Sequence, residues 1–186
     1  TYVDDAPGAV VSLGNVLPGD SGTLVVGLQA LEADLNVWFR PRLLADDENG
    51  QNEPETLAEG PDTDGVGELG ESTDVMFWLD NSAIFGACDG QADPFERRLT
   101  TPDGSDAEGS FTSVADALGD GVRLPFDGSD GCPDALPADG NRCVGFRWEL
   151  PESLGNLVQS DSLEFVLEFV AVACGNDSNP FAEVTA

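Results

Sequence analysis

Two short stretches of the sequence gather the oxygen-bearing side chains that bind calcium. The stretch 45–54 places carboxylates and amides around Gly50, and the stretch 61–65 forms a second acidic cluster. Calcium takes about six to eight oxygen ligands, which such side chains supply. Neither stretch has the spacing of an EF-hand loop, so a solvated acidic loop is the alternative interpretation. The candidate calcium ligands are Asp46, Asp47, Asn49 and Glu53.

The chain has few residues suited to catalysis, because it has no histidine. A Ser–His–Asp or Cys–His arrangement cannot be built without it, and the zinc hydrolase motifs are excluded for the same reason. No glycine-rich phosphate loop follows a strand pattern. Paired carboxylates could cleave glycosides, but with 36 acidic residues such pairs arise by chance. We therefore predict that the protein is not an enzyme.

The four cysteines, Cys88, Cys132, Cys143 and Cys174, suggest two disulfides and an oxidising compartment. Three pairings exist. Cys132 and Cys143 bracket a turn-rich stretch and could staple it, which would leave Cys88 with Cys174. A zinc site is the alternative, but no CxxC spacing or histidine supports it. We expect the pairs Cys132–Cys143 and Cys88–Cys174.

The net charge of −29 comes from 36 acidic residues against seven arginines, with no lysine. Such self-repulsion opposes compaction in dilute buffer, whereas at molar salt the Debye length falls to about 3 Å. The carboxylates are spread along the whole chain, which favours a halophilic surface over an acidic interaction tail. Because phosphate binding needs basic patches, we expect no nucleic acid or anionic lipid as partner.

Export would also expose Asn176, which begins the N-x-S sequon 176–178 in the polar tail after Cys174. Asn176 is a candidate glycan site, although such triplets also arise by chance. No stretch has the pattern of a signal peptide or a membrane span, so we expect no direct membrane insertion. If the protein is secreted, Thr1 would lie near the processing site.

The secondary-structure elements that would hold these residues in place are predicted to be β-strands. Pro125 has no backbone N–H to donate to a neighbouring strand, so the strand that contains it is predicted to lie at a sheet edge. Turns rich in Gly, Asp and Pro separate the strands, which is typical of a sandwich or jelly roll. The predicted strands cover residues 23–30, 36–40, 74–80, 122–126, 144–150 and 163–172.

One short helix is expected over 110–119, where Phe111, Val114 and Leu118 have helical spacing and Gly119 is the stop. The sequence shows no internal repeat and no linker. We therefore predict an all-β fold, a jelly-roll β-sandwich forming a single domain over 14–186, with one short helix. Long acidic loops are expected at 44–72, 86–110 and 127–142.

Residues 1–13 precede this domain as an apolar N-terminal extension interrupted at residues 7–8 by Pro-Gly. One interpretation is an ordinary first strand of the same sandwich. The other is a donor strand that adds to an open sheet edge of a neighbouring subunit. The donor residues would be Tyr2, Val3, Val10 and Val11.

Several segments together resemble haloarchaeal secreted proteins exported with SipW-type signal peptides, which are similar to the TasA/camelysin family. The segments are 18–28, 48–55, 118–122 and 143–174. The resemblance implies a jelly-roll domain with 143–174 as a core hairpin, secretion, and polymerisation into biofilm matrix fibres or bundling pili by N-terminal donor-strand exchange. Camelysin relatives are also classed as metalloproteases, but this chain lacks zinc ligands of that kind.

These observations lead to two functional hypotheses. The first is an extracellular structural subunit that polymerises with copies of itself into a surface filament, pilus or biofilm fibre. The second is a monomeric secreted module at the cell surface that binds glycan or calcium, with its N-terminal strand in its own sheet. Trp38, Trp78 and Trp148 could stack on sugars there, although strand tryptophans more often lie in a core or subunit contact.

Overall fold

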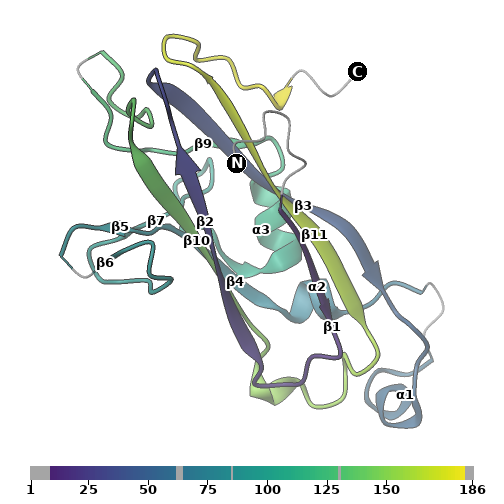
Figure 1. The fold of residues 1–186 in the computed structure, drawn as a ribbon. Helices are drawn as coiled ribbons and strands as arrows, with labels where there is room; N and C mark the ends of the chain where they lie inside the picture. The colour runs from purple at the N-terminus through teal and green to yellow at the C-terminus, as the bar shows by residue number, and fades with distance from the viewer. Residues whose placement is uncertain (1–8, 62–64, 85, 130, 183–186) are drawn as a thin grey trace.

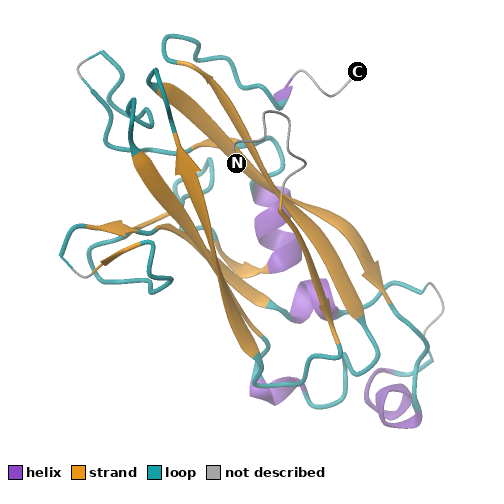
Figure 2. Ribbon diagram, in the orientation of Figure 1, coloured by secondary structure: helices purple, strands orange, loops and turns teal. Residues whose placement is uncertain are grey.

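Two larger antiparallel sheets pack face to face around one hydrophobic core in the computed structural model, which describes residues 9–61, 65–84, 86–129 and 131–182 (Figures 1 and 2). The first sheet has the order β1 (Ala9–Gly14), β11 (Ser162–Ala173), β3 (Leu35–Asp47), β9 (Val122–Arg123). The second has the order β2 (Ser21–Gln29), β10 (Asn141–Glu149), β4 (Asp74–Leu79), β7 (Arg97–Arg98), and β8 (Glu108–Ser110) also pairs with β4. A small separate ribbon pairs β5 (Asn81–Ser82) with β6 (Gly86–Ala87).

Phenylalanines join the two sheets. The ring of Phe39 on β3 lies 5.1 Å from that of Phe77 on β4, and an edge contact of 5.5 Å links Phe146 on β10 to Phe165 on β11. All four side chains are almost fully buried. Because side chains alternate along a strand, each of these residues points to the shared core while its neighbours point outward.

The predicted strands are confirmed, with changes in length. β3 continues to Asp47, well past the predicted end at residue 40, because β11 pairs with it along that whole length. The strand predicted at 122–126 is the two-residue β9, which pairs only with Trp38 and Phe39 of β3 at the sheet edge. Pro125 follows it, as expected for a residue that cannot extend a ladder.

The expected hairpin over 143–174 is wrong. β10 lies between β2 and β4 in the second sheet, and β11 lies between β1 and β3 in the first. Both flanks of each strand are therefore occupied, and residues 150–161 cross from one sheet to the other (Figure 1). Leu150 and Val158, which belong to this crossing connection, are buried.

The described residues contain three short α-helices instead of one: α1 (Glu53–Glu59), α2 (Leu69–Ser72) and α3 (Phe111–Ala117). The predicted helix is α3, whose N-cap Ser110 accepts a hydrogen bond from the Ser113 N–H. The ring centroid of Phe111 on α3 lies 4.3 Å from that of Phe165, so α3 covers part of the core. A single-turn 3-10 helix, η1 (Glu152–Leu154), begins the crossing connection.

Helices α1 and α2 occupy the stretch that was expected to be a long acidic loop. Asn52 caps α1 in a capping box: its side chain accepts from the Glu55 N–H, and the Glu55 carboxylate accepts from the Asn52 N–H. This reciprocal pair is readable in sequence as Asn-x-x-Glu with Pro54 in the first turn. No described helix has the length and apolar character that crossing a membrane would require.

The first described residues, 9–14, do not form a free extension. Residues 9–14 are the edge strand β1, which pairs antiparallel with residues 162–167 of β11 in the same chain. This is the ordinary first-strand interpretation of the sequence. The candidate donor residues Tyr2 and Val3 lie outside the described residues.

The expected disulfide pairing is wrong. All four cysteines are described, and they form Cys88–Cys143 and Cys132–Cys174, with Cα atoms 5.4 and 6.2 Å apart. Asp80, next to β4, explains the first pair: its backbone carbonyl and its carboxylate both accept from the Cys88 N–H, which holds Cys88 beside the start of β10. The second pair ties the 127–142 loop to the end of β11. Two disulfides fit a secreted protein.

Peptide mapping without reduction should recover Cys88 linked to Cys143 and Cys132 linked to Cys174. Replacing Cys132 and Cys174 together by serine should lower the free energy of unfolding by about 2–4 kcal/mol, because the unfolded chain regains loop entropy. Denaturant unfolding of the variant and the wild type measures this. Recovery of a Cys132–Cys143 peptide would show that the native pairing is the one expected from sequence.

Candidate functional site

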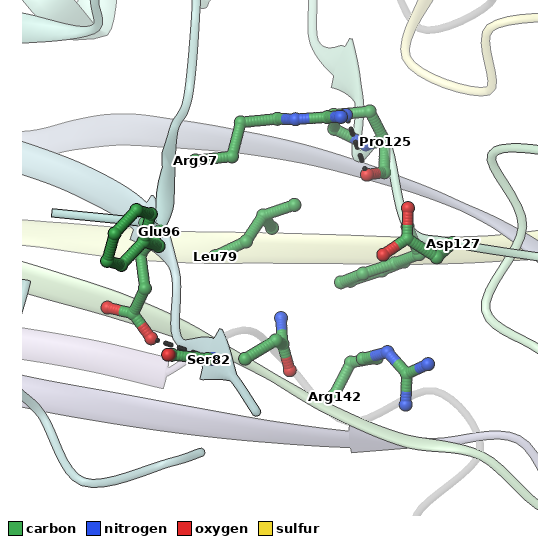
Figure 3. A pocket seen from close by; sticks show the side chains of 10 residues that line it. Leu79, Ser82, Glu96, Arg97, Pro125, Asp127 and Arg142 are labelled. Atoms are coloured by element: carbon green, nitrogen blue, oxygen red, sulfur yellow. Dashed lines mark hydrogen bonds between the residues drawn. The ribbon is translucent and has the colours of Figure 1, made fainter. Parts of the chain in front are cut away.

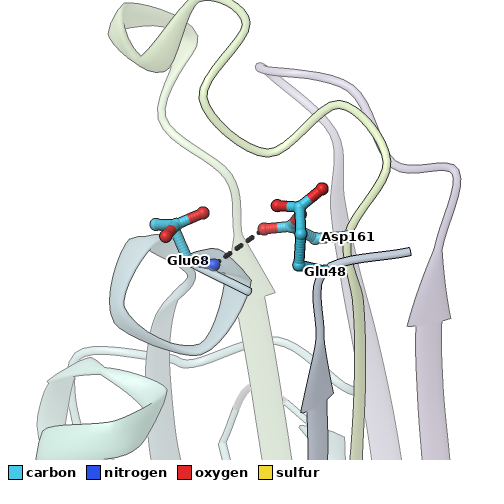
Figure 4. Close-up of side chains that lie close together, drawn as sticks. All are labelled: Glu48, Glu68 and Asp161. Atoms are coloured by element: carbon cyan, nitrogen blue, oxygen red, sulfur yellow. Dashed lines mark hydrogen bonds between the residues drawn. The ribbon is translucent and has the colours of Figure 1, made fainter. Parts of the chain in front are cut away.

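Three acidic side chains converge at one end of the first sheet (Figure 4). Glu48 follows β3, Glu68 precedes α2, and Asp161 directly precedes β11. Each contributes a carboxylate oxygen that lies within 4.8 Å of the others. We call Glu48, Glu68 and Asp161 the acidic triad. Within the described residues it is the one group of this kind.

Asp161 is the buried member of the triad, with 2% of its surface exposed. Its Oδ2 accepts a hydrogen bond of 2.8 Å from the Glu68 N–H (Figure 4). Its Oδ1 is buried and has no hydrogen-bond partner. Burial raises the pKa of Asp161 to about 6, against the hydrogen bonds with the Glu68 N–H and the Glu48 side chain, and the charges of Glu68 and Glu55 raise it further.

Backbone contacts hold the segment of Glu68 against the end of β3. The Glu48 N–H donates to the Gly65 carbonyl at 3.2 Å, and the Gly67 N–H donates to the Asp46 carbonyl at 3.1 Å. A Cβ at Gly67 would come within 3.0 Å of Asp161 Cγ and 3.1 Å of the Asp47 carbonyl carbon. A glycine here therefore allows the chain to pass directly beside the buried carboxylate.

Glu55 fixes the other side of the triad, because it anchors α1 to the crossing connection that carries Asp161. Its carboxylate is buried and accepts from the Gln159 N–H at 2.9 Å and from Ser160 Oγ at 2.7 Å. Burial acts to raise the pKa of Glu55, but the hydrogen bonds from Ser160, Asn52 and Gln159 outweigh it and hold the pKa below its usual value.

The structure does not bring the four predicted calcium ligands together. Asp46 lines an open pocket of about 250 Å³ next to Glu68, where its Oδ2 accepts from the Gly70 N–H. Burial, together with the charges of Asp47 and Glu71, raises the pKa of Asp46 to about 6 despite that bond. Asp47 is exposed, and so is Glu53 in the first turn of α1.

Asn49, the fourth predicted ligand, has a structural role. Its amide donates to the Ser160 carbonyl at 3.1 Å and to Ser162 Oγ at 2.8 Å. Sequence reasoning singled out the stretch that contains Glu48 but did not predict which acidic residues converge. Glu48 lies within that stretch, whereas Glu68 and Asp161 meet it only through the fold.

A second hollow lies on the side of the second sheet, at the open pocket of about 160 Å³ between β4, β7 and the start of β10 (Figure 3). Arg97 and Arg142 both line it, and Phe95, another lining residue, is 73% exposed. Arg97 donates to the Pro125 carbonyl at 3.1 Å, and Arg142 donates to the Asn141 carbonyl at 2.9 Å. The pocket is smaller than the clefts that usually enclose a small-molecule ligand.

The candidate donor residues Val10 and Val11 lie on β1 opposite Val166 and Phe165 of β11. Val10 is 56% exposed, whereas Val11 packs against the core. Further along β1, Leu13 is buried. The strand therefore contributes both backbone pairing and apolar contact to the first sheet.

Asn176 is exposed in the tail after β11, and its Oδ1 accepts from the Ser178 N–H at 3.0 Å. A glycan there stays a prediction. The three tryptophans do not form one platform: Trp38 lies on the first sheet, and Trp78 and Trp148 lie on the second. Trp78 is buried and Trp148 packs against the core.

Comparison with known proteins adds no assignment to this geometry. No protein-family model matches the chain, and no curated protein matches it.

Replacing Glu55 by glutamine should lower the free energy of unfolding at pH 7 by about 1–2 kcal/mol, because charge-assisted hydrogen bonds to Ser160 and Gln159 become neutral ones. A lowered folded-state pKa means that the stabilisation is present above the unfolded pKa and is lost as the pH falls through the folded value. The difference from wild type should therefore shrink on acidification.

Denaturant unfolding at molar salt, at pH 7 and below pH 4, measures both effects. Glu53→Gln, an exposed residue in the same helical turn, removes the same charge and should leave stability within about 0.5 kcal/mol of wild type. An equal loss in Glu55→Gln at both pH values would show that packing, and not the charge, is what Glu55 contributes.

Proposed function

We propose that the chain is an extracellular structural subunit with a jelly-roll fold. It polymerises with copies of itself when β1 of one subunit pairs with β11 of the next. The result is a surface filament, pilus or biofilm fibre, as in the TasA/camelysin proteins that the sequence resembles. The observation that carries the proposal is the placement of β1: it is an edge strand, and pairing and burial on β11 hold it in place.

The order of pairing supports the jelly roll. Taken along the chain, the eight strands of the two sheet paths are β1, β2, β3, β4, β7, β9, β10 and β11. The first pairs with the last, the second with the seventh, the third with the sixth, and the fourth with the fifth. This is the pattern of one long antiparallel ribbon wrapped into two facing sheets, as in a jelly roll.

An edge strand at one end of the described chain is suited to exchange. When β1 leaves, it uncovers one side of β11 and the core site of Leu13, and it breaks no other strand pair. A second copy of β1 would restore the same hydrogen bonds and apolar contacts, so exchange between identical chains costs little in contacts. Pairing by strand addition also needs no energy source outside the cell.

The charge and the disulfides of the chain indicate the environment in which it would assemble. Both disulfides fit an oxidising, extracellular setting. A net charge of −29 keeps neighbouring subunits apart in dilute buffer and is screened at molar salt. We infer that assembly takes place in brine, which is where a halophilic organism would deploy it.

The monomeric binding module is the alternative, and one observation favours it. Within a single chain β1 already pairs with its own β11, which is the arrangement expected of a closed monomer. Its ligand site would be the pocket that Arg97, Arg142 and the exposed Phe95 line together with Glu96 and Asp127. Size-exclusion chromatography in molar salt would then give one sharp monomer peak.

Two cysteine variants test the exchange directly. Ser12 of β1 lies opposite Glu164 of β11, and both side chains are exposed. Directly opposed residues of antiparallel strands come close enough for a disulfide. An equimolar mixture of Ser12→Cys and Glu164→Cys should form covalent dimers containing one of each, seen by electrophoresis without reduction and identified by peptide mapping.

The double variant Ser12→Cys/Glu164→Cys is the matched control. A disulfide within one chain locks β1 in place, so this variant should stay monomeric under conditions in which wild type forms filaments in electron micrographs. Filaments of normal length from the locked variant would refute the proposal. So would wild-type filaments with no mixed cross-link, since assembly would then use another surface.

A further inference from the structure

We propose that the acidic triad, Glu48, Glu68 and Asp161, is a calcium-binding site that joins the end of β3, the start of α2 and the end of the crossing connection. This inference goes beyond the proposed function, because all three ligands belong to one chain and none lies on β1. The site would exist in the monomer and in the polymer alike.

The state of Asp161 points to a ligand independently of the clustering of acids. The residue is 2% exposed, and its Oδ1 is buried with no hydrogen-bond partner, while Oδ2 is held by the Glu68 N–H. Buried polar atoms are nearly always satisfied, and an exception calls for an explanation such as a bound ion. The carboxylate is thus fixed in orientation by one oxygen and has the other available to a cation.

Among the described residues, no cationic side chain pairs with this oxygen. Lysine and histidine are absent from the sequence. Each arginine makes its contacts elsewhere: Arg40 and Arg42 with Glu168, Arg97 with Pro125, Arg98 with Glu108, Arg123 with Asp134 and Asp177, Arg142 with Asn141, and Arg147 with Glu149. Buried charges are normally paired or coordinate metals. A proton shared with a neighbouring carboxylate or a bound cation can neutralise Asp161, and of these two only a cation can be shared by all three carboxylates of the triad.

The donor set selects the ion. Three carboxylates are hard oxygen ligands, which suit calcium or magnesium and not the softer transition metals. Two oxygens can share one ion only if their separation is at most twice the metal–oxygen distance, which is about 5 Å for calcium and about 4 Å for magnesium. Each pair of triad oxygens, within 4.8 Å of one another, meets the calcium limit, and a small movement of the side chains would bring all three oxygens to one ion.

Carboxylates that bind through both oxygens, together with water, can complete the coordination that calcium needs. The surroundings also suit an ion that must be retained in brine. Buried charges are screened by salt much less than exposed ones, so the pull of Asp161 on a divalent ion survives conditions that weaken surface binding. Ion binding would also stabilise the fold, because it fastens three segments that are remote in sequence.

The test titrates calcium chloride into the full chain, after treatment with a chelator, in molar sodium chloride near pH 7.5. Isothermal titration should show one saturable site. At a calcium concentration about a hundred times the dissociation constant, the melting temperature should rise by roughly 5–10 °C. Absence of both the binding heat and the thermal shift in the wild-type chain would overturn the proposal.

Asp161→Asn is the diagnostic variant, because asparagine keeps an acceptor for the Glu68 N–H and removes the charge. It should weaken calcium binding at least tenfold, and without calcium it should melt at or above the wild-type temperature, since an unpaired buried charge is gone. A purely structural aspartate predicts the opposite, a lower melting temperature with the calcium response intact. Glu68→Gln should weaken binding in the same way.

Glu71→Gln is the matched control: it removes one exposed charge from α2, outside the triad. Its calcium affinity should stay within about twofold of wild type, as for a surface charge screened by salt. An equal loss in this control would mean diffuse counterion attraction and no site, and tighter binding of magnesium would overturn the choice of calcium. The locked variant Ser12→Cys/Glu164→Cys should bind calcium normally, so failure to polymerise and failure to bind are distinguishable.

Discussion

The packing of phenylalanines between the two sheets is the interaction on which the rest of the structure depends. Phe39 and Phe165 of the first sheet meet Phe77 and Phe146 of the second, and Phe111 of α3 covers the same core. With a net charge of −29 and few ion pairs to offset it, the surface of this chain opposes compaction. Apolar burial is the attraction that persists at every salt concentration, and salt decides only how strongly the surface opposes it.

The core also sets where the polar features can occur. β10 and β11 lie in different sheets on either side of the core, so the chain between them must cross from one sheet to the other. Asp161 is the last residue of this crossing connection and lies at the end of the first sheet. A segment that crosses between layers carries backbone groups that need partners. Glu55 of α1 satisfies two of these, at Gln159 and Ser160, so the missed helix α1 is part of how the crossing connection is fixed. The acidic triad forms where this connection, β3 and α2 meet.

Local patterns in the sequence predicted the strands and α3, because alternation and helical spacing are properties of neighbouring residues. The choice of partner strand is not local. Nothing in the sequence between Cys143 and Cys174 shows that β10 and β11 each pair with two other strands. The predicted hairpin between them was therefore wrong. The predicted cysteine pairing was wrong as well. The sequence did not predict the acidic triad for a similar reason. Glu48 belongs to the predicted stretch, but its companions Glu68 and Asp161 are placed beside it by β11 pairing with β3 and by the turn before α2.

Topology also separates β1 from the other sheet edges. β9 and β7 are two residues long, and Pro125 follows β9, so neither presents much free backbone to another chain. β2 is a long edge strand, yet it lies between β1 and β3 in the chain, and its removal would pull on both. β1 is the first described strand and pairs with β11 alone, so it can leave and be replaced while the facing sheets stay in contact. The feature that would let subunits exchange a strand is therefore the same feature that leaves the phenylalanine core of each subunit undisturbed.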